Sequence, residues 1–290
     1  MHARAVAATA SALLGLVALL LPISGARADH ESGHPAVIAH RGASAMAPEN
    51  TLLAVDRARR LGFTWVENDV QRTKDGVLVV LHDVGLARTT NVERVFPGRA
   101  PWRVRDFTSA EIARLDAGSW FGRRFKGARV PTLRQYLARV DRNRQSLLLE
   151  LKNPTLYPGI ARQVLAELRR SGWLDRAHLK RLVIQSFDAP TMRTVHRLRP
   201  AVRTAVLGAP SVDRLREYAR FADQINPQHL KLTVGYVAAV QRLRGPHGRP
   251  VEVCAWTVDR PVDTLIAATY GVDCLITNRP DVVRRALSVF

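Results

Sequence analysis

The sequence predicts an α/β fold, specifically a (β/α)8 TIM barrel, because of its strand–helix alternation, its length and its first loop. Eight strand-like segments alternate with seven or eight helical ones, which is the order that a barrel of parallel strands requires. The chain has 290 residues, and barrels of this kind commonly use about 250 residues as one domain. The loop after the first strand, Arg41-Gly42-Ala43-Ser44, does not fit the G-x-G-x-x-G motif of a doubly wound nucleotide-binding sheet.

Each element follows from a local pattern. Residues 36–40 form a short apolar run, which is typical of a strand buried on both faces. Asn50 can cap a helix over residues 51–61 that Gly62 ends. Asp75-Gly76 predicts a tight hairpin between residues 64–71 and 77–81. The remaining strands are expected at 147–151, 182–186, 203–207, 223–226, 251–257 and 273–277, and the helices near 159–171, 190–198, 212–221, 233–243, 260–270 and 280–289.

A long segment after the hairpin interrupts this rhythm. Residues 83–131 show little periodicity but contain six of the 18 aromatic residues. A segment this long without regular structure is usually functional or a small subdomain. We therefore expect one barrel domain over residues 36–290, with an insertion at 83–131 that caps one end of the barrel.

The N-terminus has the pattern of a secretory signal peptide. A basic start, Met1–Arg4, precedes an apolar run, and Ala26-Arg27-Ala28 forms a small-x-small cleavage site. An uncleaved membrane anchor is the alternative, but Pro22 and the cleavage site favour removal of residues 1–28. We expect a secreted product, in the extracellular or cell-wall space, without a stable membrane span.

Composition narrows the class of partner. The chain is 47% hydrophobic and 24% charged, which excludes wholesale disorder. Its net charge is +19, and 39 of its 44 basic residues are arginines. This excess indicates either a phosphate-bearing partner or a compositional bias toward arginine. No dense basic run is interleaved with aromatic residues, so nucleic acid is not expected. The sequence does not indicate an oligomeric state.

The two cysteines are too few for a disulfide scaffold or a four-cysteine zinc site. Cys254 and Cys274 lie on the last two predicted strands, where a disulfide is geometrically conceivable. We expect two buried thiols instead, because a disulfide across neighbouring parallel strands strains its geometry.

Polar side chains gather where the predicted strands end, which in such barrels is the end that carries the active site. Glu67 and Asp69 are two residues apart and so point to one face of their strand, as do Glu150 and Lys152. Depending on whether the hairpin turn centres on Asp75-Gly76 or one residue earlier, His82 returns opposite Asp69 or Glu67. The other strand-end residues are His40, Arg41, Gln185, Asn226 and Trp256.

This inventory indicates phosphoryl transfer at a diester. Three carboxylates, Glu67, Asp69 and Glu150, suit Ca²⁺ or Mg²⁺ better than zinc. Arg41 and Lys152 could hold the phosphate, and the imidazoles of His40 and His82 could supply a general acid and a general base. Simpler interpretations remain open: Lys152 could form only a structural ion pair with Glu150, and Trp256 could be either a core residue or a substrate wall.

The spacing of the motifs makes this interpretation specific. The segments His40-Arg41-Gly42-Ala43-Ser44, Pro48-Glu49-Asn50-Thr51, Glu67-Asn68-Asp69 and His82-Asp83 resemble the glycerophosphodiester phosphodiesterase family, in its secreted bacterial form. Downstream matches are Glu150-Leu151-Lys152, Gln185-Ser186-Phe187, Trp256-Thr257-Val258 and Ile276-Thr277-Asn278-Arg279-Pro280-Asp281.

The resemblance implies a metal-dependent barrel that hydrolyses glycerophosphodiesters to glycerol 3-phosphate and an alcohol. It implies His40 and His82 as the acid/base pair, and Glu67, Asp69 and Glu150 as ligands of a calcium or magnesium ion. Arg41 and Lys152 would bind phosphate, with Gln185 and Trp256 as further substrate-binding residues. In the family, the glycerol hydroxyl next to the phosphate is a usual proposal for the nucleophile, giving a cyclic phosphate that is then hydrolysed.

Three positions depart from the family's usual residues. Ala87 stands where an acidic residue is frequent, Asp259 where Asn is frequent and Cys274 where Gly is frequent. None belongs to the implied metal or acid/base set. The substrate is expected to be a small glycerophosphodiester or a glycerol-phosphate polymer. The alternatives are a phospholipase of the same barrel superfamily, of the phosphatidylinositol-cleaving or sphingomyelinase D type, and a non-catalytic module that binds anionic wall polymers.

Overall fold

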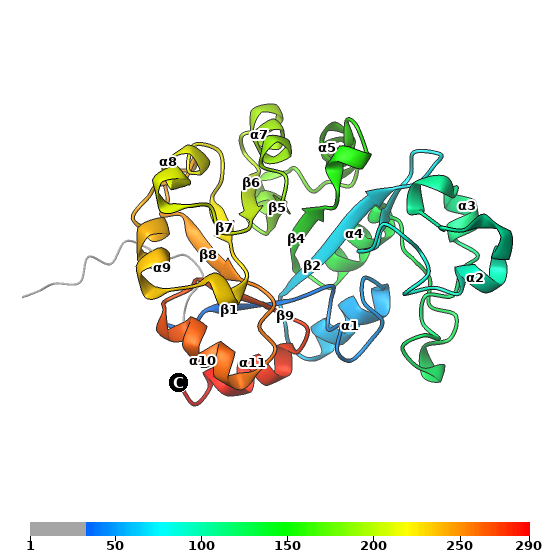
Figure 1. Cartoon of the computed structure of the whole chain (residues 1–290), viewed down its shortest axis with the longest axis horizontal. Helices are drawn as coiled ribbons and strands as arrows, with labels where there is room; N and C mark the ends of the chain where they lie inside the picture. The colour runs from blue at the N-terminus through cyan, green and yellow to red at the C-terminus, as the bar shows by residue number, and fades with distance from the viewer. Residues whose placement is uncertain (1–32) are drawn as a thin grey trace, which may run out of the picture. The chain divides into compact units, whose positions relative to one another are not determined.

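Eight parallel strands close into a barrel. The computed structural model describes residues 33–290, so the predicted signal peptide, residues 1–28, lies outside the described residues. The closure is visible in the pairing of β1, which bonds to both β2 and β9. This confirms the predicted (β/α)8 barrel (Figure 1). The barrel strands in order are β1 (Ala36–Ala39), β2 (Trp65–Arg72), β4 (Ser146–Leu151), β5 (Leu182–Ser186), β6 (Arg203–Leu207), β7 (Gln224–Asn226), β8 (Glu252–Ala255) and β9 (Cys274–Thr277).

Helices follow most of the strands and cover the outside of the barrel (Figure 1). The first helix begins at Thr51, whose side chain accepts a hydrogen bond from the Ala54 amide. The prediction that Asn50 caps this helix is therefore wrong, and the Asn50 amide instead donates to Asp69. The helices are α1 (Leu52–Arg60), α4 (Leu133–Arg142), α5 (Ile160–Arg170), α6 (Arg176–Leu179), α7 (Ala189–Leu198), α8 (Leu215–Tyr218), α9 (Val234–Gln241), α10 (Pro261–Thr269) and α11 (Pro280–Leu287).

The hairpin turn differs from both predicted registers. Strand β3 (Leu78–Val80) runs antiparallel to β2, with Val70 opposite Val80. This register leaves three loop residues, 74–76, and the last of them, Gly76, has the left-handed φ of +83° that such loops need. The Leu81 amide bonds to the Asp69 carbonyl. His82 therefore returns level with β2 between Glu67 and Asp69, rather than opposite either one.

The barrel interior has an apolar layer directly beneath the polar residues at the strand ends. Ile38, Leu148 and Val183 belong to this buried inner cluster. Because successive side chains on a strand alternate between faces, the residues two positions later point into the same interior. Those residues are His40, Glu150 and Gln185. The apolar layer thus closes the floor of the site, while a larger core packs between the strands and the surrounding helices.

The segment at 83–131 lies beside the β2–β3 hairpin and has its own core (Figure 1). It contains two short helices, α2 (Val92–Val95) and α3 (Ser109–Ile112). Phe107, which is fully buried, packs in a cluster that also includes Val79 and Leu81 from the hairpin side. The Lys74 amide bonds to the Phe107 carbonyl. The insertion is therefore joined to the barrel through the strand that leads to His82.

The two cysteines lie opposite each other on the last two strands. Cys254 of β8 pairs in register with Cys274 of β9, and both are buried. The structure joins them in a disulfide, with their Cα atoms 4.4 Å apart. The expectation of two free buried thiols is therefore wrong: direct register pairing in the barrel wall brings the two backbones to the short end of the range that disulfides span.

No helix within residues 33–290 is long and apolar enough to cross a membrane.

Candidate active site

A pocket opens at the carboxyl ends of the barrel strands, where the sequence predicts the site. It collects eight of the nine predicted site residues, and the ninth, Asp69, is buried beside it against Arg41 and Lys152. Sequence reasoning missed four lining residues that carry no charge. The lining residues are His40, Arg41, Glu67, His82, Glu150, Lys152, Gln185 and Trp256, joined by the missed Phe187, Leu207, Thr257 and Ile276.

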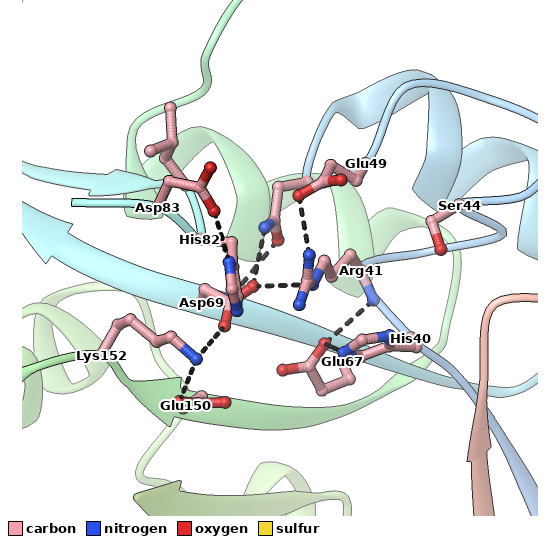
Figure 2. Close-up of polar contacts among 12 residues, drawn as sticks. His40, Arg41, Ser44, Glu49, Glu67, Asp69, His82, Asp83, Glu150 and Lys152 are labelled. Atoms are coloured by element: carbon pink, nitrogen blue, oxygen red, sulfur yellow. Dashed lines mark hydrogen bonds and ion pairs between the residues drawn. The ribbon is translucent and has the colours of Figure 1, made fainter. Parts of the chain in front are cut away.

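Strand register brings the three carboxylates together. Asp69 lies opposite Glu150 on the neighbouring strand, and Glu67 precedes Asp69 by two residues on the same face. One oxygen from each of the three lies within 4.8 Å of the others, and all three side chains are buried. Figure 2 shows Asp69 between the basic side chains of Arg41 and Lys152, with Glu67 and Glu150 below it in the view. Such a buried acidic cluster needs cationic partners, because unpaired buried charge is costly.

Burial and mutual repulsion perturb the cluster. Burial, together with the negative charge of Asp69, raises the pKa of Glu67 well above its usual range and that of Glu150 to about 8. Burial also acts to raise the pKa of Asp69, but the charges of Arg41 and Lys152 outweigh it and the net pKa is lowered. Two of the three acids are thus short of positive charge.

The residues fit a hard divalent cation. Among residues 33–290, Glu67 Oε1 and Asp69 Oδ1 are buried oxygens without a hydrogen-bond donor. Carboxylate oxygens in a group of three are ligands that Ca²⁺ and Mg²⁺ prefer. A cation among these oxygens would contact both atoms, of which Asp69 Oδ1 otherwise has only the 3.6 Å ion pair with Lys152. It would also offset the repulsion that raises the pKa of Glu67 and Glu150.

Arg41 connects the first strand to the acidic cluster. Its backbone amide donates to Glu67 Oε2 at 2.9 Å, and its Nε lies 3.3 Å from Asp69 Oδ2. Its Nη1 also donates to Glu49 Oε1 at 2.9 Å, an interaction that sequence reasoning missed. The guanidinium is therefore fixed by two carboxylates at the pocket wall, in a geometry suited to bind a phosphate oxygen.

Lys152 is the second cation of the pocket. Its Nζ donates to Glu150 Oε1 at 2.9 Å and lies 3.6 Å from Asp69 Oδ1. The ion pair with Glu150, which was the simpler interpretation, is thus present. Lys152 also lines the pocket, so this pairing does not remove it from reach of a substrate.

His40 is oriented from the far end of the chain. Its Nδ1 lies 2.7 Å from Asn278 Oδ1, which requires the proton on Nδ1 and leaves Nε2 as an acceptor near Glu67, 3.9 Å from Oε2. Asn278 is in turn held by Asp259, which accepts from its side-chain and backbone nitrogens. Burial, and then the charge of Arg41, lowers the pKa of His40 to about 4. The imidazole is therefore neutral near pH 7.

His82 has a different partner. Its Nδ1 lies 2.7 Å from the carboxylate of Asp83. Hydrogen bonds from Arg88, together with that of His82, lower the pKa of Asp83, so this carboxylate is ionised. The two histidines thus have contrasting environments: an amide oxygen beside His40 and a carboxylate beside His82.

Aromatic side chains form one wall. The indole of Trp256 donates to the Asn226 carbonyl at 2.7 Å, and its ring meets Phe187 edge to face at 5.5 Å. Phe187 is 54% exposed and lines the pocket, so its ring presents an apolar face at the pocket mouth. Asn226 does not line the pocket but donates to Gln185 at 2.9 Å, holding that amide in place.

The residues missed by sequence reasoning are mainly partners of the predicted ones. Glu49, Asn50, Asp83 and Asn278 stand inside the recognised motifs, yet their hydrogen bonds depend on three-dimensional placement. Asp259, noted only as a departure from the family, is well suited here because its two oxygens accept bonds from Thr277 and Asn278.

The fold and site are those of a barrel hydrolase for phosphate esters. The comparisons with known proteins identify the family. The glycerophosphoryl diester phosphodiesterase family model matches residues 40–282. The chain belongs to this family, as the sequence motifs predicted, and is an enzyme of the phosphoric diester hydrolase class.

Relatives and solved structures agree over most of the chain. A glycerophosphodiester phosphodiesterase of Caldanaerobacter subterraneus is 34% identical over 254 residues, covering 84% of this chain and 94% of the relative. A phosphodiesterase of Oleispira antarctica, solved with its product sn-glycerol-3-phosphate, has a TM-score of 0.75 at 27% identity and covers 88% of this chain and 97% of its own. A glycerophosphodiester phosphodiesterase of Agrobacterium tumefaciens has a TM-score of 0.66 at 30% identity, with coverage of 87% and 99%.

Cation binding should stabilise the folded protein measurably. A ligand at 100 times its dissociation constant adds about 2.7 kcal/mol to the free energy of unfolding. We expect Ca²⁺ or Mg²⁺ to raise the melting temperature of the chelator-treated protein, and Glu67→Gln combined with Glu150→Gln to abolish the rise. Glu93→Gln, an exposed position in α2, is the control. An equal rise in melting temperature in the wild type, the double variant and Glu93→Gln would show that the cation binds elsewhere.

Proposed function

We propose that the protein is a secreted, metal-dependent glycerophosphodiester phosphodiesterase that uses His40 and His82 as an acid/base pair. The observation that carries the proposal is one pocket lined by two cationic side chains, two imidazoles, Glu67 and Glu150, with Asp69 of the same carboxylate cluster buried beside it. Its substrate is a glycerophosphodiester, which it hydrolyses to glycerol 3-phosphate and an alcohol.

Glu67, Asp69 and Glu150 would hold one divalent cation, Ca²⁺ or Mg²⁺. When bound, such an ion polarises a phosphoryl oxygen and offsets the negative charge that develops in the transition state. The two buried carboxylate oxygens without a hydrogen-bond donor and the raised pKa of Glu67 and Glu150 support this assignment. Arg41 and Lys152 would contact the remaining phosphate oxygens and orient the phosphorus in the pocket.

The two histidines would have opposite roles. His40 has its Nδ1 proton held by Asn278, so its free Nε2 can accept the proton of the attacking hydroxyl. The ring of His82 is oriented by the contact of its Nδ1 with the Asp83 carboxylate, and we assign it the delivery of a proton to the leaving alcohol oxygen. The attacking group is either the adjacent glycerol hydroxyl, as the family resemblance implies, or water.

We infer the substrate class from the similar proteins. The Oleispira antarctica phosphodiesterase carries sn-glycerol-3-phosphate, which is the product expected here. Gln185 and Trp256 would contact the glycerol or alcohol side of the substrate, since both line the pocket beside the cationic groups. A small glycerophosphodiester and a glycerol-phosphate polymer present the same ester to this site. The relatives reported above favour this activity over the phospholipase and non-catalytic alternatives.

Loss of either imidazole should remove most turnover without unfolding the protein. General acid–base catalysis contributes about 10²–10⁴-fold to rate, so His40→Ala and His82→Ala should each lower kcat by that order. The assay is release of glycerol 3-phosphate from glycerophosphocholine, with melting curves to verify folding. His247→Ala is the control, because His247 precedes β8 and lies at the other end of the barrel. A folded His82→Ala protein with near-wild-type kcat would contradict the two-histidine mechanism.

Export is proposed from the N-terminal pattern of residues 1–28. Sequencing the N-terminus of the protein recovered from the culture medium should give Asp29 as the first residue. Ala26→Arg combined with Ala28→Arg should block cleavage, because the processing site requires small residues. Recovery of the full-length chain only, within the cells, would contradict export.

A further inference from the structure

We propose that Arg88, contributed by the insertion, is a positioning residue that holds the proposed phosphate-binding and acid/base side chains in place together. The inference rests on the roles proposed for Arg41 and His82. Arg88 itself does not line the pocket, and it acts through two carboxylates that do touch these residues.

One guanidinium bridges two acids. Arg88 Nε donates to Asp83 Oδ2 at 2.6 Å, and Nη2 donates to Asp83 Oδ1 at 3.0 Å. Nη1 donates to Glu49 Oε2 at 2.8 Å, and Nη2 donates to Glu49 Oε1 at 2.7 Å. Both carboxylates are thus bound in the bidentate manner that only the planar fork of arginine provides.

Each acid also contacts a residue of the pocket. Glu49 Oε1 accepts from Arg41 Nη1 at 2.9 Å, and Asp83 Oδ1 pairs with His82 Nδ1 at 2.7 Å. Figure 2 shows these two contacts on either side of Asp69. The chain of contacts therefore runs from Arg41 through Glu49, Arg88 and Asp83 to His82. It links a group expected to bind phosphate with one expected to protonate the leaving group.

The insertion holds the backbone around Arg88. Leu86 is fully buried in the insertion core, and its amide bonds to the Trp102 carbonyl. Thr90 Oγ1 donates to the Leu86 carbonyl at 2.7 Å, closing the turn that carries Arg88. The insertion thus provides a fixed base from which one side chain reaches back to the site.

A purely stabilising role is a weaker account of this arrangement. The Arg88 side chain is 45% exposed, and its partners Asp83 and Glu49 are 30% and 12% exposed. Ion pairs of a half-exposed arginine contribute little to the free energy of unfolding. Partners that orient metal ligands, by contrast, commonly change affinity or activity by about 10–100-fold when removed, and we expect an effect of this order for the partners of Arg41 and His82.

Single substitutions test the Glu49–Arg41 contact and the Asp83–His82 contact separately. Arg88→Ala should lower kcat/KM for glycerophosphocholine by about 10–100-fold with little change in melting temperature. Glu49→Gln should mainly raise KM and weaken binding of glycerol 3-phosphate in calorimetry, because it loosens Arg41. Asp83→Asn should mainly lower kcat, because it removes the carboxylate beside His82. Arg88→Ala should combine both effects, and adding it to the Glu49→Gln, Asp83→Asn double variant should change little further.

Rescue and control variants make the inference falsifiable. Guanidinium ion, at concentrations that leave the protein folded, should restore part of the activity of Arg88→Ala, whereas ammonium should not. Arg88→Lys should remain impaired, because one ammonium cannot bind both carboxylates in bidentate fashion. Arg94→Ala removes an exposed arginine of the same insertion and should behave as wild type.

Wild-type kinetics and product binding in Arg88→Ala, or full activity in Arg88→Lys, would overturn the inference. A fall in activity that only parallels a fall in melting temperature would also overturn it. If Arg88→Ala does not fold, the same measurements on Arg88→Lys, Glu49→Gln and Asp83→Asn decide the question. An inactive wild-type protein would instead contradict the proposed function, and product binding by calorimetry would still test the position of Arg41.

Discussion

The site depends on three carboxylates that the barrel forces together. The register between β2 and β4 places Asp69 against Glu150, and the two-residue repeat of a strand adds Glu67 on the same face. Buried acids so close repel one another unless positive charge is supplied. Arg41 and Lys152 supply part of it by contacting Asp69, while Glu67 and Glu150 keep a raised pKa. The remaining need for positive charge is the physical reason to assign a divalent cation here.

The surrounding structure fixes the groups that would act on the phosphate. The apolar layer below excludes water from the floor of the pocket, and each imidazole is oriented by a different partner, Asn278 for His40 and Asp83 for His82. That contrast supports the proposal that one acts as base and the other as acid. Preorganised partners of this kind avoid the cost of reorganisation during the reaction. The insertion takes part through Arg88, so it is joined to the site rather than only attached beside it.

Much of the fold and the site could be predicted from the sequence. Both depend on the two-residue alternation of side chains along a strand and on which residues stand at the strand ends. The alternation of strands and helices predicts the barrel. The polar residues at the strand ends predict that His40, Glu67 and Glu150 gather in one pocket. The hairpin loop, the cap of α1 and the cysteine pairing were predicted wrongly, since each depends on a shift of one residue or on direct register. Asn278 was missed as a partner because its contact with His40 spans 238 residues and leaves no local pattern. Glu49 and Asp83 are near Arg41 and His82 in the sequence, but whether their side chains meet depends on the path of the loops.

The central claim is that a divalent cation held by Glu67, Asp69 and Glu150 is needed for hydrolysis. The most direct measurement is the rate of glycerol 3-phosphate release from glycerophosphocholine by the full chain after exhaustive chelation and after metal is returned. The account predicts that the rate is lost on chelation and restored by Ca²⁺ or Mg²⁺, because the carboxylate cluster otherwise repels the phosphate. Full activity of the chelated protein would contradict it, and would leave Arg41 and Lys152 to bind the phosphate alone.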